Sequence, residues 1–186
     1  MDFVRSLQGY EHLWAVKFPG EDADELTRVF RNWSNFDFLL DFFLDNFKDL
    51  DHFFSIRSIR KAIQDTVEDA DYLEKMILQF PGTEDLDKLF HPLSLSDNRA
   101  AELTREKARN WDRERHASWL RIYAVRLEEG IYVVTGGAIK LTPTMQERPH
   151  TKAELDKMDK CREYLKSNGV FDQDSFIDYI NEERND

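Results

Sequence analysis

The chain has few of the residues that cross-link small secreted proteins or interrupt regular structure: its 186 residues include one cysteine, five prolines and seven glycines. The single cysteine, Cys161, excludes an internal disulfide framework and is typical of proteins in a reducing compartment. No apolar run approaches the roughly 18 residues that a membrane-spanning helix needs. The N-terminus also lacks the basic and apolar segments of a signal peptide. These absences predict a cytoplasmic protein with no membrane partner.

Motifs for metal or cofactor binding are also missing. The five histidines lie far apart, and no HExxH, CxxC or paired-carboxylate spacing is found. There is no phosphate-binding GxxxxGK[ST] loop, and Gly136-Gly137 alone does not make a dinucleotide-binding fingerprint. We therefore expect neither a metal nor a cofactor.

Apolar and aromatic residues are plentiful, so the chain is expected to fold. The hydrophobic share is 41%, and aromatics reach 13% with 14 phenylalanines, which is too apolar for a disordered chain. The length predicts a single domain, 1–186. The net charge of −11 hides a division into an acidic part, 1–98 (net −10), a basic part, 99–166 (net +4), and an acidic end, 167–186 (net −5).

The acidic first part is predicted to be mostly helical. Residues 13–18 form a short strand, and Asp22 or Asp24 caps a helix after it. A Phe-rich helix from Asn35 to Leu50 is expected to be buried on much of its surface, and a third helix follows up to Phe80. These apolar stripes are typical of core packing, although they would also suit a ligand pocket. Residues 83–98 are expected to be loop-rich, and residues 100–115 helical.

The best-defined local pattern is a β-hairpin. Residues 119–127 and 131–135 are strand-like, and Glu128-Glu129-Gly130 between them suits a turn with Gly in the left-handed conformation. Gly136-Gly137 predicts a bulge or a close backbone approach, after which residues 138–141 continue the strand. Helices at 151–166 and 174–183 complete the chain. The predicted fold is α+β, with a small antiparallel sheet, including a hairpin at about 119–141, packed against several α-helices.

Basic side chains gather on and beside this hairpin, with a tyrosine and a histidine near them: Arg121, Arg126, Lys140, Arg148, Tyr123 and His150. Alternation along a strand places Arg121 and Tyr123 on the same face. If Leu127 faces Ile131, Arg121 falls opposite Gly137, which leaves space above that face. A guanidinium and an ammonium on one concave face suit a phosphodiester. Ordinary charged residues on a surface strand would give the same pattern.

The hairpin resembles the core of a known family. Leu120-Arg121-Ile122-Tyr123, a turn, Tyr132-Val133-Val134-Thr135, a basic residue and a terminal helix are similar to the RelE/ParE toxin superfamily, nearest its HigB and phage-derived branch. The resemblance covers roughly residues 88–166, and residues 13–18 with the helices after them would supply the opening strand and helical pair. The chain departs from the family in its greater length, its acidic charge and its Phe-rich helices.

The resemblance implies a toxin of a toxin–antitoxin system that cleaves mRNA without a metal. Its partners would be an antitoxin protein and RNA or the ribosome; it implies no oligomeric state. Arg121 would stabilise the phosphorane charge, and Lys140 would hold or protonate phosphate oxygens. The remaining implied roles are weaker: orientation or proton transfer for Tyr123, Arg148 and His150, and contacts to the substrate for Lys107, Arg109 and Arg126.

Two other functions stay open at this point. A non-catalytic protein-binding module on the same scaffold, as in the ParE branch, would need no catalytic cations. A metabolic or regulatory module would bind its ligand among the aromatic helices. His150, which follows Pro149 in a predicted loop, also has an ordinary interpretation as a surface histidine.

Overall fold

The computed structural model describes residues 1–6, 11–79, 83–93, 103–109 and 118–183, and within these it has an α+β fold. The strands are β1 (Asp2–Arg5), β2 (Leu13–Lys17), β3 (Phe90–Pro92), β4 (Leu103–Ala108), β5 (Leu120–Leu127) and β6 (Tyr132–Ile139). The helices are α1 (Glu25–Trp33), α2 (Phe36–Asp45), α3 (Phe47–Phe54), α4 (Ile59–Gln79), α5 (Thr83–Leu89), α6 (Pro149–Ser167) and α7 (Gln173–Glu183), with a 3₁₀ turn at Glu128–Gly130. The predicted fold class is confirmed.

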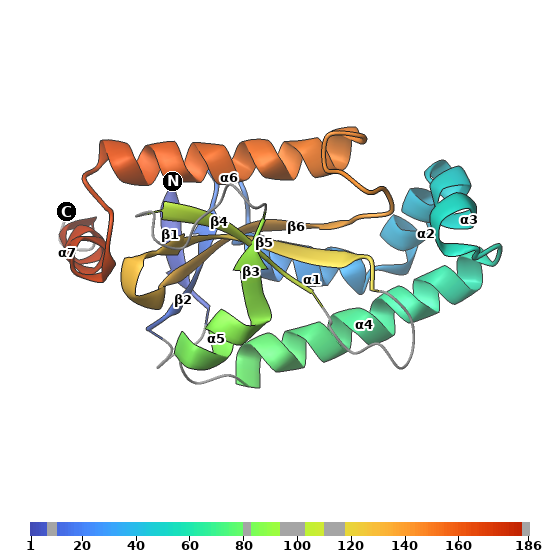
Figure 1. The fold of residues 1–186 in the computed structure, drawn as a ribbon, viewed down its shortest axis with the longest axis horizontal. Helices are drawn as coiled ribbons and strands as arrows, with labels where there is room; N and C mark the ends of the chain where they lie inside the picture. Colours follow the sequence, from blue (N-terminus) through green and yellow to red (C-terminus); the bar gives the residue numbers. More distant parts are fainter. Residues whose placement is uncertain (7–10, 80–82, 94–102, 110–117, 184–186) are drawn as a thin grey trace.

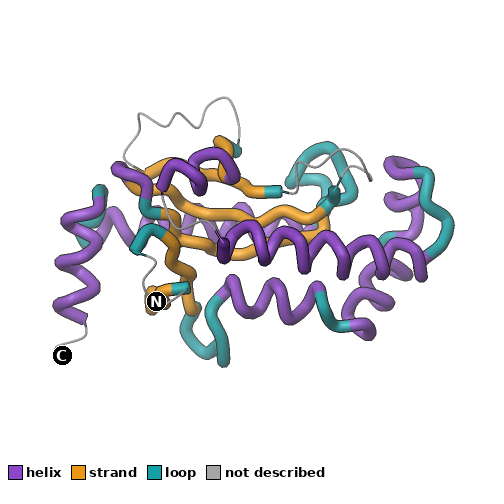
Figure 2. The backbone as a smooth tube through the Cα atoms, turned by 90° about the horizontal axis from the view of Figure 1, so that it is seen from below, coloured by secondary structure: helices purple, strands orange, loops and turns teal. Residues whose placement is uncertain are grey.

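The six strands form one sheet in the order β1-β2-β6-β5-β4-β3. It is mixed rather than wholly antiparallel, because β2 joins β6 in parallel while the other neighbours are antiparallel. Figure 1 shows α6 along one face of the sheet and α1 and α4 on the other. Apolar side chains fill both interfaces, so the sheet is buried on both sides over much of its area. In Figure 2 the helix that ends at the C-terminus lies at one end of the molecule.

The predicted hairpin is confirmed. β5 and β6 pair antiparallel around the 3₁₀ turn, where Gly130 takes a left-handed φ of 87°. A bulge between Tyr123 and Ala124 shifts the register, as the glycine pair indicated. Because of this shift Arg121 lies opposite Ala138, and Gly137 lies opposite Ile122. The expected pairing of Arg121 with Gly137 is therefore off by one residue.

The segment expected to be a helix over 100–115 contains a strand instead. β4 pairs with β5 along its whole length, from Leu103 opposite Leu127 to Ala108 opposite Ile122. Glu, Lys, Arg and Ala are good helix formers, but differences in helix propensity are small in free energy, and pairing with a neighbouring strand overrides them. The structure describes residues 103–109 of that segment, and 110–115 lie outside the described residues. This correction places the basic residues of β4 in the same sheet as Arg121.

The Phe-rich segment differs from the expectation in two ways. It forms two helices, α2 and α3, which meet at Asn46. Only part of its apolar surface is covered: Leu39, Phe43 and Leu50 are buried, whereas several of its other large apolar side chains are exposed. Apolar composition cannot tell which side of a helix has a neighbour. Where a loop was expected over 83–98, the described residues form α5 and β3.

No helix within the described residues is long and apolar enough to cross a membrane.

Candidate functional site

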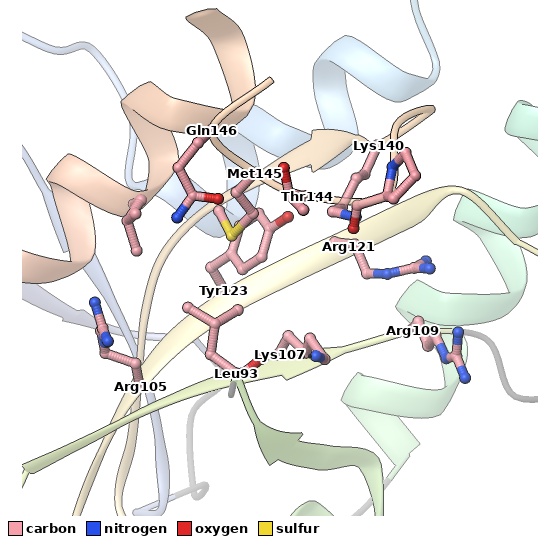
Figure 3. A pocket seen from close by; sticks show the side chains of 12 residues that line it. Leu93, Arg105, Lys107, Arg109, Arg121, Tyr123, Lys140, Thr144, Met145 and Gln146 are labelled. Atoms are coloured by element: carbon pink, nitrogen blue, oxygen red, sulfur yellow. Dashed lines mark hydrogen bonds between the residues drawn. The ribbon is translucent and has the colours of Figure 1, made fainter. Parts of the chain in front are cut away.

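An open pocket of about 780 Å³ lies on the α6 face of the sheet, between β4, β5 and the loop that joins β6 to α6 (Figure 3). Five cationic side chains line it: Arg105, Lys107, Arg109, Arg121 and Lys140. Tyr123 lies at its centre in the view of Figure 3. Apolar groups from Leu93, Met145 and Leu155 complete the wall. We call this site the cation pocket.

Strand register explains why these side chains converge. Lys107 on β4 lies directly opposite Tyr123 on β5, so the two side chains leave the same face of the sheet. Arg121 lies two residues before Tyr123 on that same face. Arg109 follows the last paired residue of β4 and continues this register toward Arg121. Arg105, Lys107 and Arg109 alternate along β4 and so face the pocket together.

Arg121 is largely buried, and no carboxylate of the described residues contacts it. Its Nη1 donates to the carbonyl oxygens of Ser118, at 2.8 Å, and Leu120, at 2.6 Å. Burial and, to a smaller extent, the positive charge of Arg109 together lower the pKa of Arg121 to about 10. The guanidinium still carries its charge at neutral pH, but in an environment that disfavours that charge.

Lys140, at the other side of the pocket, also donates to carbonyl oxygens and also has a lowered pKa. Its ammonium donates to the carbonyl oxygens of Thr142, at 2.6 Å, and Pro143. Burial lowers the pKa of Lys140, as do the charges of Arg121 and Lys107, while Glu147 opposes the shift. Mutual repulsion of this kind requires that the cations lie close together. An anion in the pocket would relieve it.

Tyr123 adds a neutral donor among the cations. The residue is completely buried, and its hydroxyl has no hydrogen-bond partner among the described residues. Burial raises the pKa of Tyr123, so the phenol stays protonated and can donate a hydrogen bond but cannot act as a base at neutral pH. A buried hydroxyl without a partner is rare in folded proteins and costs stability.

Two other cations of the pocket have partners at its edge. Lys107 donates to the carbonyl oxygen of Leu93 at 2.9 Å. Arg105 forms an ion pair with Asp159 of α6, at 3.3 Å between Nη1 and Oδ1. Arg105 was not among the predicted site residues. The alternation of Arg105, Lys107 and Arg109 is a strand signal that would have included it.

Three predicted site residues lie elsewhere. Arg126 lies on the opposite face of the sheet, where its Nε is 3.1 Å from Asp87 Oδ1. The five-residue separation from Arg121 is odd, so alternation alone puts the two arginines on different faces. Arg126 therefore does not join the cation pocket.

Arg148 and His150 follow the pocket loop without entering the pocket. Arg148 binds both carboxylate oxygens of Asp49 at 2.6 Å, which ties the start of α6 to α3. The ring of His150 lies 5.2 Å from that of Phe42, and its Nε2 is 3.0 Å from the carbonyl oxygen of Ile139. Burial lowers the pKa of His150. Both residues fix the loop end, and neither lines the cation pocket.

Other candidate chemistry finds little support within the described residues. They contain no group of three or more His, Cys, Asp or Glu side chains placed to hold a metal ion. Cys161 is a residue of α6 and is buried in an apolar cluster, where burial raises the pKa of its thiol to about 12. A thiol with so high a pKa is a poor nucleophile.

A comparison with known protein families finds no matching family model, and neither curated proteins nor solved structures yield a match. The functional argument therefore depends on the geometry of the cation pocket.

Proposed function

We propose that the cation pocket binds the phosphate backbone of RNA and that the protein is a RelE/HigB-like endoribonuclease. One observation carries the proposal. Arg121 and Lys140 line the same pocket, and within the described residues their hydrogen bonds go to carbonyl oxygens, while the Tyr123 hydroxyl beside them has no partner there. A phosphate group would supply the acceptors that these three side chains lack.

The pocket suits cleavage by the neighbouring 2′-hydroxyl of the RNA. The 2′-oxygen attacks phosphorus and forms a new P–O bond, while the bond from phosphorus to the 5′-oxygen breaks. The 2′-proton passes to solvent water. Lys140 donates a proton to the departing 5′-oxygen, and its lowered pKa makes it a better acid. Arg121 and Tyr123 donate hydrogen bonds to the phosphorane oxygens, where negative charge accumulates.

The arrangement of elements agrees with what the resemblance implies. The strand β2 precedes the helices α1 and α2, and the hairpin β5–β6 precedes the long helix α6. The basic residues of β4 lie beside the strand that carries Arg121, where the family has its charged segment. As part of the same proposal, the protein acts in the cytoplasm on mRNA, free or on the ribosome, and has an antitoxin partner.

The test is cleavage of a labelled RNA by the purified protein in the presence of a metal chelator, with and without ribosomes. Wild-type protein should release 2′,3′-cyclic phosphate ends. Arg121→Ala should slow cleavage by about 10²–10³-fold, the usual effect of losing one donor to a developing oxyanion. Lys140→Ala should also slow it, since the leaving oxygen loses its acid.

Lys152→Ala is the matched control. Lys152 is an exposed cation on α6 that pairs with Asp156, at 3.0 Å, outside the pocket. This substitution should leave the rate within about twofold, because surface ion pairs contribute little. Folded wild-type protein that cleaves no RNA under either condition would contradict the proposal, and a non-catalytic protein-binding module would then be the better hypothesis. Equal losses in Arg121→Ala and Lys152→Ala would show that general charge, not the pocket, is responsible.

A further inference from the structure

Helix α2 exposes large apolar side chains beside a row of carboxylates. Phe36 and Leu44 are 59% and 55% exposed, and Leu40, between them on the same side of the helix, is half-buried. Spacing of four residues puts these three in one line, which we call the apolar stripe. Asp37, Asp41 and Asp45, all exposed, each follow one residue later and form a parallel acidic stripe. Two such stripes on one helix make an amphipathic surface that the described part of the fold leaves largely exposed.

The core accounts for Leu40, which packs against it, but not for the exposed Phe36 and Leu44. Leu39 and Phe43 already face inward and are completely buried, so α2 is anchored without Phe36 and Leu44. Figure 1 places α2 and α3 at one end of the molecule, opposite α7. Single exposed apolar residues are ordinary, but an aligned set at an end of the fold is typical of an interaction surface.

We infer that the two stripes of α2 bind a basic, amphipathic α-helix of another protein. Apolar residues of that helix would cover Phe36, Leu40 and Leu44, and its Lys or Arg side chains would meet the acidic stripe. Helix-on-helix recognition of this kind uses apolar anchors at spacings of three and four residues. Charge complementarity sets the orientation and speeds association. The inference does not depend on RNA cleavage by the cation pocket.

The charges of α2 argue against other occupants. A second copy packed with its α2 antiparallel across a two-fold axis would bring acidic stripe against acidic stripe, which is repulsive. Membrane surfaces and nucleic acids are anionic and would be repelled by Asp37, Asp41 and Asp45. A basic protein helix satisfies both stripes.

The probe is a synthetic 18-residue helical peptide with Leu on one face and Lys on the other, titrated against the intact protein at low salt. A peptide of the same design with Glu in place of Lys is the charge-reversed probe. The Lys peptide should bind and the Glu peptide should not. Phe36→Ser combined with Leu44→Ser should weaken binding by at least about tenfold, because buried apolar anchors dominate such interfaces. Both sites are exposed, so the fold should survive, which circular dichroism will check.

The chain offers a matched control for the charge effect. Helix α7 carries Asp174, Asp178 and Glu182, all exposed and at the same four-residue spacing. Asp37→Asn, Asp41→Asn and Asp45→Asn together should weaken binding by about tenfold, as expected for loss of several complementary charges. The α7 variant Asp174→Asn, Asp178→Asn and Glu182→Gln removes the same charge and should change binding less than about twofold.

Three results would overturn the inference. Equal weakening of Lys-peptide binding by the α7 and α2 charge variants would mean that net charge alone attracts the peptide. The wild type could instead self-associate and become monomeric in the Phe36→Ser, Leu44→Ser variant, which would assign the stripes to a second copy. Binding to anionic vesicles that this variant abolishes would assign them to a membrane.

Discussion

Each face of the sheet has an arginine close to a tyrosine, but the two pairs differ in their hydrogen-bond and ion-pair partners. On the α6 face, Arg121 contacts only carbonyl oxygens and the Tyr123 hydroxyl has no partner among the described residues. On the other face, Arg126 lies 3.1 Å from Asp87, and the hydroxyl of Tyr132 donates to the same carboxylate. The Arg126 guanidinium also lies 5.8 Å from the centre of the Tyr132 ring.

This comparison separates a structural network from a candidate binding site. Asp87 neutralises the charge of Arg126 and accepts a hydrogen bond from Tyr132, so these interactions stabilise the fold. Within the described residues, Arg121 has no carboxylate partner and the Tyr123 hydroxyl has no hydrogen bond, so burying them costs stability. Groups that destabilise the free protein are typical of sites that bind a ligand, because the ligand completes their interactions. Three predictions test the comparison, beginning with the largest expected effect.

Replacement of the two arginines should change stability in different ways. Arg126→Met should lower the free energy of unfolding by about 3 kcal/mol, because it removes the Arg126 side of a largely buried ion pair with Asp87. Arg121→Met should leave the free energy of unfolding unchanged or raise it, since it removes a poorly compensated buried charge while keeping an apolar stem. Denaturant unfolding of both variants measures the difference. Equal losses would mean that Arg121 is as structural as Arg126.

Removal of each tyrosine hydroxyl tests the same comparison, with a smaller expected change in the free energy of unfolding. Tyr132→Phe should cost about 1.5–3 kcal/mol, the usual value for a hydrogen bond to a charged group. Tyr123→Phe should be neutral or stabilising, because no bond within the described residues is lost. Affinity for phosphate should fall in Tyr123→Phe and stay constant in Tyr132→Phe. Loss of stability in Tyr123→Phe would show that its hydroxyl has a structural partner.

The smallest expected effect is a pH dependence from Lys140. Burial and neighbouring cations lower the pKa of Lys140, so the unfolded chain keeps this proton to higher pH than the folded protein does. Stability should therefore rise with pH from the lowered pKa of Lys140 up to the unfolded value of 10.5. The total gain should stay below about 1 kcal/mol, because Lys140 is partly exposed and solvent screens it.

Unfolding measured at several pH values tests this expectation. Lys140→Met should reduce the rise. Inorganic phosphate should also reduce it, since a bound anion raises the pKa of Lys140 toward its ordinary value. An identical rise in wild type and Lys140→Met would assign the pH dependence to other groups, of which Arg121, with its pKa lowered to about 10, is the first candidate.

Predictions that depended on strand alternation, turn residues and helix caps held. The hairpin, its turn at Gly130 and its glycine bulge follow from side-chain alternation and backbone freedom, and the structure has all three. The strand expected at 13–18 and the helix cap expected from Asp22 or Asp24 follow in the same way, and the structure has β2 at Leu13–Lys17 and Asp24 as the cap of α1. Predictions that depended on distant contacts fared worse. β4 was expected to be helical, and the Phe-rich helices were expected to be covered.

The predictions about the candidate site also divide into those that depended on neighbouring residues and those that depended on distant contacts. Alternation within one strand placed Arg121 and Tyr123 together, and it equally implies that Arg126 faces the other way. Two features of the site depend on contacts between segments far apart in the chain. The basic residues of β4 join the cation pocket, and Arg148 pairs with Asp49 instead of lining the pocket.

The sequence by itself determined an α+β protein with a basic hairpin unit between acidic segments, because composition, alternation and turn residues are local properties. The tertiary structure alone decided which cations share a pocket. Strand register sets the face on which a side chain lies, and packing decides which charges meet a carboxylate. It also decided that Phe36 and Leu44 stay uncovered, since burial depends on the neighbours that a helix finds.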